Sequence, residues 1–85
     1  MIHWTRIAGS RAIRALGLEM GAGGGIDGGG GDGGHARLHV QFRRGTTYVY
    51  DVGSRAYFDR FIDAPSKGRY YVFVIKQRFD YVKKY

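Results

Sequence analysis

Basic side chains and tyrosines are the residues of this chain whose types and spacing point to a binding chemistry. Tyr48 and Tyr50 stand two positions apart, and aromatic rings are able to stack on the bases of single-stranded nucleic acid. Lysine and arginine side chains bind phosphate groups. The candidate binding residues for an acidic partner are Lys67, Arg69, Lys76, Arg78, Lys83, Lys84, Arg11 and Arg14. Tyr48 and Tyr50 are the candidate aromatic rim beside them.

The charge of the chain is concentrated at its two ends. The net charge is +7, of which residues 1–14 carry +3 and residues 66–85 carry +5, whereas residues 15–65 carry −1. Such asymmetry indicates nucleic acid, an anionic surface or an acidic protein as the partner. The alternative interpretation is a basic surface that serves only solubility, because charge by itself discriminates weakly between the two.

Residues able to catalyse a reaction or hold a metal ion are few. The chain has no cysteine, which excludes a thiolate metal site, a disulfide and a cysteine nucleophile. Asp27, Asp32 and His35 lie in a glycine-rich segment that would have to become ordered before it could bind a metal. His39 makes no convincing catalytic constellation with its neighbours, and we expect it to be a polar surface residue. The sequence therefore predicts no enzyme, no metal, no cofactor and no small-molecule substrate.

The elements that must position these residues belong to one small domain, since the chain has 85 residues. Residues 21–34 contain ten glycines in fourteen positions, a composition that predicts a flexible loop. This loop separates an N-terminal strand region, residues 1–20, from a core formed by residues 35–85.

A β-hairpin is predicted directly after the glycine-rich segment. Leu38, Val40 and Phe42 alternate with polar residues, as in a half-buried strand, and residues 46–50 are rich in strand-forming side chains. The register of this hairpin decides where the two tyrosines point.

Two hairpin registers are open. A two-residue loop, Arg44–Gly45, places the tyrosine pair on the face of His39, whereas a three-residue loop, residues 43–45, places it on the face of Leu38. Three-residue loops typically have glycine in last position, in the left-handed conformation. We favour this second register, and with it the interpretation that the tyrosines belong to the core.

Helices are predicted in the C-terminal half. Ser54 is able to cap a helix, and Pro65 ends it by forcing Ala64 out of helical geometry. The apolar side chains of this helix lie on one face and are Tyr57, Phe58, Phe61 and Ile62.

Residues 70–82 fit either a strand or a helix. Their composition favours a strand, but Tyr71, Ile75, Phe79 and Val82 share one helical stripe, and the run is long for a strand. We favour the helix, on which Lys76 and Arg78 would face outward.

These elements predict an α+β fold, a small three-stranded antiparallel sheet in meander order packed by one or two C-terminal helices. The N-terminal region, with Ile7, Ile13, Leu16 and Leu18, supplies one of the strands.

The order of several short motifs resembles the KTSC domain, a module named for the C-terminus of some lysyl-tRNA synthetases and also found alone in small bacterial and phage proteins. The residues that carry the resemblance are Leu38-x-Val40-x-Phe42, Gly45, Tyr48-Val49-Tyr50, Ala64-Pro65-Ser66-Lys67-Gly68-Arg69-Tyr70, Ile75-Lys76 and Phe79. From Leu38 to Phe79 the pattern aligns without a gap. Upstream, residues 10–19 resemble the first strand of the family. Ser54 and Val72 depart from it, since the family usually has proline and asparagine there.

The association of this family with synthetases implies a non-enzymatic accessory module that binds RNA. The alternative is a structural subunit of a larger assembly, such as a capsid or tail accessory protein of a phage virion. No apolar run approaches the roughly 18 residues of a membrane span, and the first residues do not resemble a signal peptide. We therefore expect no membrane partner and a cytoplasmic location, or the virion if a phage encodes the chain.

Overall fold

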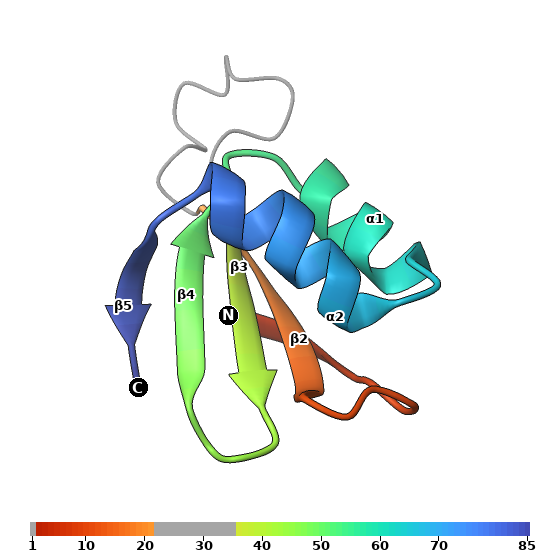
Figure 1. Cartoon of the computed structure of the whole chain (residues 1–85). Helices are drawn as coiled ribbons and strands as arrows, with labels where there is room; N and C mark the ends of the chain where they lie inside the picture. Colours follow the sequence, from red (N-terminus) through yellow and green to blue (C-terminus); the bar gives the residue numbers. More distant parts are fainter. Residues whose placement is uncertain (1, 22–35) are drawn as a thin grey trace.

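Five antiparallel strands form a single sheet in the order in which they follow one another along the chain (Figure 1). The computed structural model describes residues 2–21 and 36–85, so Asp27, Asp32, His35 and most of the glycine-rich loop lie outside the described residues. The strands are β1 (Ile2–Arg6), β2 (Ile13–Met20), β3 (Ala36–Phe42), β4 (Thr47–Asp51) and β5 (Tyr81–Lys84).

The prediction of an α+β meander is confirmed, but the prediction of three strands is wrong. The two additional strands, β1 and β5, form the edges of the sheet. Neither has the alternating apolar pattern of a half-buried strand, because their side chains are largely exposed. Both are therefore held mainly by pairing with their neighbours, which is a non-local interaction that sequence periodicity does not report.

The hairpin of β3 and β4 has the three-residue loop that the position of Gly45 predicts. The amide of Phe42 donates to the carbonyl of Thr46 over 2.8 Å, and Gly45 has a φ of 107°. A residue with a side chain is strained at such a positive φ, whereas glycine is not. In this register Tyr50 pairs with Leu38, so its side chain lies on the core face of the sheet.

The helices are α1 (Ala56–Asp63), α2 (Lys67–Tyr70) and a π-helical turn η2 (Tyr71–Lys76) that continues α2. The hydroxyl of Ser54 accepts a hydrogen bond from the amide of Ala56 over 3.1 Å, and Ala64 before Pro65 is extended. The expected C-terminal end of α1 is therefore confirmed, whereas its N-cap is Arg55, one residue after Ser54, without a side-chain cap hydrogen bond. The preference for helix in residues 70–82 is correct for the first part of that run, but its last residues form β5.

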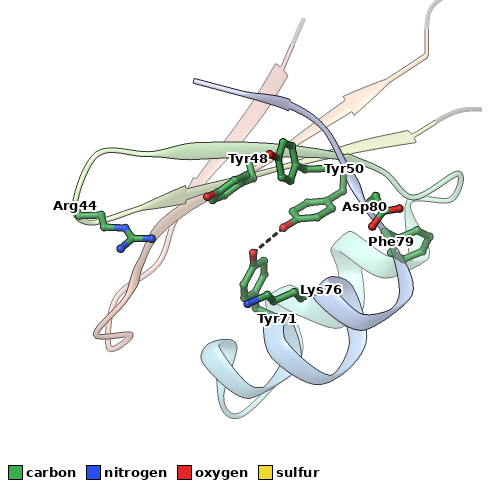
Figure 2. A pocket seen from close by; sticks show the side chains of 8 residues that line it. Arg44, Tyr48, Tyr50, Tyr71, Lys76, Phe79 and Asp80 are labelled. Carbon is green, nitrogen blue, oxygen red and sulfur yellow. Dashed lines mark hydrogen bonds between the residues drawn. The ribbon is translucent and has the colours of Figure 1, made fainter.

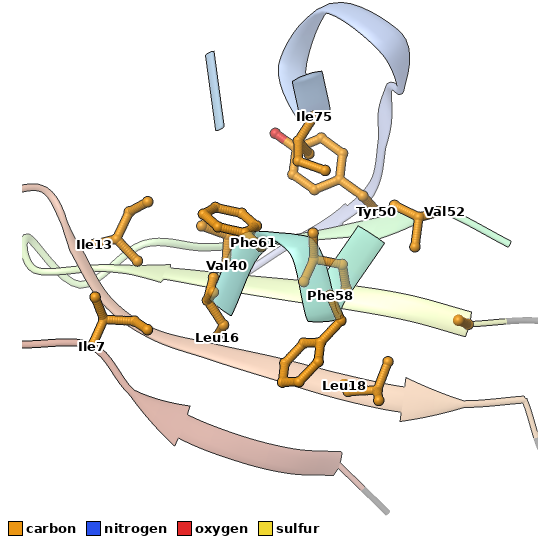
Figure 3. Close-up of a cluster of buried hydrophobic side chains, with 12 residues drawn as sticks. Ile7, Ile13, Leu16, Leu18, Val40, Tyr50, Val52, Phe58, Phe61 and Ile75 are labelled. Carbon is orange, nitrogen blue, oxygen red and sulfur yellow. The ribbon is translucent and has the colours of Figure 1, made fainter. Parts of the chain in front are cut away.

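The hydrophobic core lies between the helices and one face of the sheet (Figure 3). Phe58 and Phe61 of α1 are buried against Leu16 and Val40 of the central strands, and Ile75 of η2 is fully buried beside them. The predicted apolar face of α1 is thus confirmed. Because the helices cover this face, a side chain of β4 that points toward them, such as that of Tyr50, is buried beneath η2.

Within residues 2–21 and 36–85 no helix packs on the opposite face of the sheet, yet His39 on this face is only 4% exposed. The expectation that His39 is a polar surface residue is therefore wrong. The ring of Trp4, on the strand β1 that was not expected, lies 5.8 Å from the His39 ring, and His39 Nε2 donates to Glu19 Oε1 over 2.8 Å. Gly17 lies between them, and a Cβ there would stand 2.7 Å from Ile2 Cγ2. The absence of a side chain at Gly17 lets the side chains of Ile2 and Trp4 on β1 lie over this part of the sheet.

Candidate functional site

A cleft of about 660 Å³ opens where β4, η2 and β5 meet, and its volume lies within the range of roughly 300–1,000 Å³ that is typical of ligand pockets. Most of the residues that line it are aromatic, with charged residues among them (Figure 2). The residues that line it are Arg44, Tyr48, Tyr50, Tyr71, Lys76, Phe79, Asp80 and Tyr81.

Two tyrosine hydroxyls meet inside the cleft. The hydroxyl oxygens of Tyr50 and Tyr71 lie 2.6 Å apart, and one donates a hydrogen bond to the other (Figure 2). Burial, together with this hydrogen bond, raises the pKa of Tyr50 far above its ordinary value. The hydroxyl of Tyr50 therefore stays protonated and offers hydrogen-bonding groups rather than a charge.

The two tyrosines of the expected aromatic rim have different environments. Tyr48 is half-buried at the cleft, and its ring centroid lies 4.9 Å from that of Tyr81, which is 52% exposed. Tyr50 is only 3% exposed, although it lines the cleft. Its ring belongs to the core, as the preferred hairpin register implied, because it lies under η2. The aromatic rim that solvent reaches thus consists of the half-buried Tyr48 and the exposed Tyr81.

The π-helical turn brings Lys76 to the cleft. In an α-helix, residues five positions apart lie roughly 140° apart around the axis, so Lys76 would point away from Tyr71. In a π-helix the backbone hydrogen bond joins residues i and i+5, which places both on the same side. Lys76 is exposed, as expected, and it lines the cleft together with Tyr71 because η2 is a π-helix.

An irregularity in β5 places a second lysine over the aromatic rim. Tyr81 pairs with Tyr50 and Lys84 pairs with Tyr48, so Val82 is an extra residue that shifts the register between them. Lys84 Nζ consequently lies 5.6 Å from the centroid of the Tyr48 ring, in a cation–π contact. Lys83 pairs with Val49, whose side chain points to the opposite face of the sheet.

The remaining predicted basic residues lie outside the cleft. Lys67 Nζ donates to the carbonyl oxygen of Ala64 over 2.6 Å, and thus stabilises the end of α1. Arg69 and Arg78 are exposed on the helix without lining the cleft. The other two are Arg11, which lines a separate hollow of about 470 Å³ with residues 65–68, and Arg14, which is exposed on β2.

Several cleft residues were not among the expected binding residues. They are Arg44, Tyr71, Phe79, Asp80 and Tyr81. Tyr71 and Phe79 were expected on the buried stripe of a helix, and Arg44 in a turn. The local structure around each residue was therefore predicted, but not that all three would line the same cleft. Tyr81 could have been found only by identifying β5, which reads as the end of the helical run.

No group of three or more histidine, cysteine, aspartate or glutamate side chains within residues 2–21 and 36–85 is placed to hold a metal ion. In the same part of the chain, no helix has both the length and the apolar character needed to cross a membrane.

Comparison with known proteins identifies the family. The model of the KTSC domain matches residues 30–79, which is more than half of the chain. The crystal structure of a KTSC domain protein from Yersinia pestis superposes with a TM-score of 0.70 and 27% sequence identity, over 98% of this chain and 97% of that chain. A search among curated proteins finds no match. The chain therefore belongs to the KTSC domain family.

Proposed function

We propose that the chain is a non-enzymatic module that binds single-stranded nucleic acid, RNA before DNA, in the cleft between β4, η2 and β5. The observation that carries this proposal is the combination of an aromatic rim with cations on the same cleft. An unpaired base is needed, because a base within a duplex does not expose its face to an aromatic side chain.

Base stacking uses the rings at the mouth of the cleft. Tyr81 is 52% exposed, and Tyr48 beside it is half-buried, so a base is able to lie against this pair. Stacking of one base on an aromatic side chain contributes about 1–3 kcal/mol and tolerates any sequence.

Phosphate binding uses the cations around these rings. Arg44 in the β3–β4 loop and Lys76 on η2 line the cleft, and Lys84 lies over Tyr48. Among the lining residues Asp80 carries the negative charge, and Arg44 and Lys76 carry positive charges, so the net charge of the site is positive. Neutralising phosphates releases counterions, which makes the affinity fall steeply as salt rises.

The test is a fluorescence anisotropy titration of the chain with a single-stranded RNA of about eight nucleotides, a length within the footprint of small binding modules. Measurements at about 50 mM and about 200 mM salt report the electrostatic contribution. We expect binding that is strong at low salt and weaker at high salt. Absence of binding at low salt would overturn the proposal.

Matched variants locate the binding surface. Lys76→Gln removes a cation of the cleft, and Lys83→Gln removes one from the opposite face of the sheet. We expect Lys76→Gln to weaken binding and to reduce the salt dependence by about one phosphate contact, whereas Lys83→Gln has a smaller effect. Tyr81→Leu should weaken binding about tenfold through lost stacking. If the two lysine variants weakened binding equally, RNA would bind outside the cleft.

The alternative proposal, a structural subunit of an assembly such as a phage virion, is favoured by apolar side chains that stay exposed on η2 and β5. Val72, Phe73 and Val82 are 43%, 60% and 54% exposed, and such side chains are common at protein interfaces. This alternative predicts that the chain elutes from a sizing column as an oligomer. A monomer at high protein concentration, together with RNA binding, would decide against it.

A further inference from the structure

The cleft has a polarity along its length. Figure 2 shows Arg44 at one end and Asp80 at the other, with the tyrosine side chains between them. A nucleotide has a similar polarity, since its phosphate is an anion and the edge of its base carries neutral donors and acceptors. A phosphate at the Arg44 end therefore directs the base toward Asp80.

The hydrogen-bonding groups beside the aromatic rim are a pair of acceptors and a donor. An ionised carboxylate such as that of Asp80 only accepts, and it presents two oxygen atoms side by side. Each tyrosine hydroxyl carries one hydrogen, so the bond between Tyr50 and Tyr71 uses one hydrogen and leaves the other for a further acceptor.

Among the four bases of RNA, guanine complements this set of groups best. Its pairing edge presents two adjacent N–H donors, from N1 and N2, beside the acceptor O6. Uracil offers a single N–H between two carbonyl groups, and adenine and cytosine each offer an amino group beside a ring nitrogen that accepts. The two carboxylate oxygens of Asp80 would face an acceptor in each of these three bases.

We infer that the cleft selects guanine in single-stranded RNA, with the carboxylate of Asp80 accepting from N1–H and N2–H and the Tyr50–Tyr71 pair donating to O6. This inference rests on the proposed function, because it assigns the base that the same cleft takes. It goes beyond that function, since stacking and phosphate contacts alone do not distinguish one base from another.

The experiment measures anisotropy with fluorescein-labelled RNAs of about eight nucleotides that differ at one central position in a background of uridine. A single guanosine avoids the self-association of guanine-rich strands. We expect the strand with guanosine to bind about tenfold more tightly than the all-uridine strand, which is the discrimination typical of a bidentate base contact. Strands with adenosine or cytidine should bind within about threefold of the all-uridine strand.

Asp80→Asn is the decisive variant, because it keeps the shape of the side chain and replaces one acceptor oxygen with a donor. We expect the guanosine preference to fall to about twofold or less, while the all-uridine strand binds as tightly as before or more tightly. Asp63→Asn is the matched control, since it removes an exposed carboxylate at the end of α1 that does not line the cleft. This control should keep the preference.

The outcomes separate the two proposals. If all strands bind equally and Asp80→Asn changes nothing, the guanine assignment is overturned and RNA binding stands. If no strand binds at low salt, both proposals fail. Competition with guanosine 5′-monophosphate identifies the source of the guanine. Displacement only at concentrations far above that of the RNA supports recognition within a strand, and displacement at equal concentration would overturn it in favour of a free nucleotide.

Discussion

The hydroxyl groups of Tyr50 and Tyr71 join β4 to the π-helical turn η2 by a hydrogen bond of 2.6 Å inside the cleft. Tyr50 is buried and pairs with Leu38 across the sheet, whereas Tyr71 comes from the far side of the cleft. This contact ties the candidate binding site to the core, so the stability of the fold reports on the geometry of the site.

Tyr71→Phe should lower the free energy of unfolding by about 1–2 kcal/mol, because the hydroxyl of Tyr50 then loses its partner in a buried position. The ring of Phe keeps the edge-to-face contact with Phe42, whose centroid lies 5.2 Å away. Urea unfolding followed by circular dichroism measures the effect. Tyr50→Phe combined with Tyr71→Phe should be less destabilising than the sum of the single variants. Strict additivity would show that the two hydroxyls do not interact.

The hydrogen bond between His39 and Glu19 predicts a pH dependence of stability at acid pH. The hydrogen bond from His39 lowers the pKa of Glu19 below its ordinary value of 4.5. Ionised Glu19 therefore stabilises the fold above pH 4.5, and this contribution is lost as the pH falls through the lowered pKa. It should be less than about 1 kcal/mol, since the carboxylate is partly exposed. Unfolding free energies measured between about pH 6 and pH 3 should fall less steeply for Glu19→Gln. If the unfolding free energies of Glu19→Gln and of the unchanged chain had the same slope against pH, the contact between Glu19 and His39 would not be a source of the pH dependence.

Gly17 and Gly68 should respond in opposite ways to alanine. A Cβ on Gly17 would lie 2.7 Å from Ile2 Cγ2 and 3.1 Å from Trp4 Cε3, so Gly17→Ala must displace these side chains of β1 and destabilise the fold by about 1–3 kcal/mol. At Gly68, in α2, a Cβ meets nothing within 4 Å, and Gly68→Ala should stabilise by about 0.4–1 kcal/mol. Urea unfolding measures both, and the fluorescence of Trp4 reports the movement of β1. A stable Gly17→Ala variant with unchanged Trp4 emission would contradict this account of β1.

Phe61 and Phe73 are a matched pair of aromatic residues with opposite burial. Phe61 is fully buried in the core, whereas Phe73 on η2 is 60% exposed. Phe61→Ala should cost about 3–5 kcal/mol, which is a large part of the stability of a domain of this size. Phe73→Ala should change it by about 0.5 kcal/mol or less. Thermal unfolding by circular dichroism distinguishes the two, and similar losses would show that Phe73 is buried in solution by another molecule.

The local parts of this fold could be predicted from the amino-acid sequence. The alternation around Val40, the apolar stripe of α1 with its end before Pro65, and the position of Gly45 in its loop follow from the geometry of single elements. The hairpin register, and with it the burial of Tyr50, followed from loop chemistry alone. The family could be identified for the same reason, because its motifs lie within these elements.

The composition of the cleft, in contrast, depends on how the elements pack together. Tyr81 lines it because β5 pairs with β4, and Lys84 lies over the ring of Tyr48 because the register of β5 is irregular. Lys76 lines it because η2 winds as a π-helix. Edge-strand pairing and π-helical winding depend on contacts between residues far apart in the sequence, whereas periodicity reports only regular local geometry. The basic residues of the site were therefore recognisable from the sequence as a group, but which of them face the same aromatic rings was settled by packing.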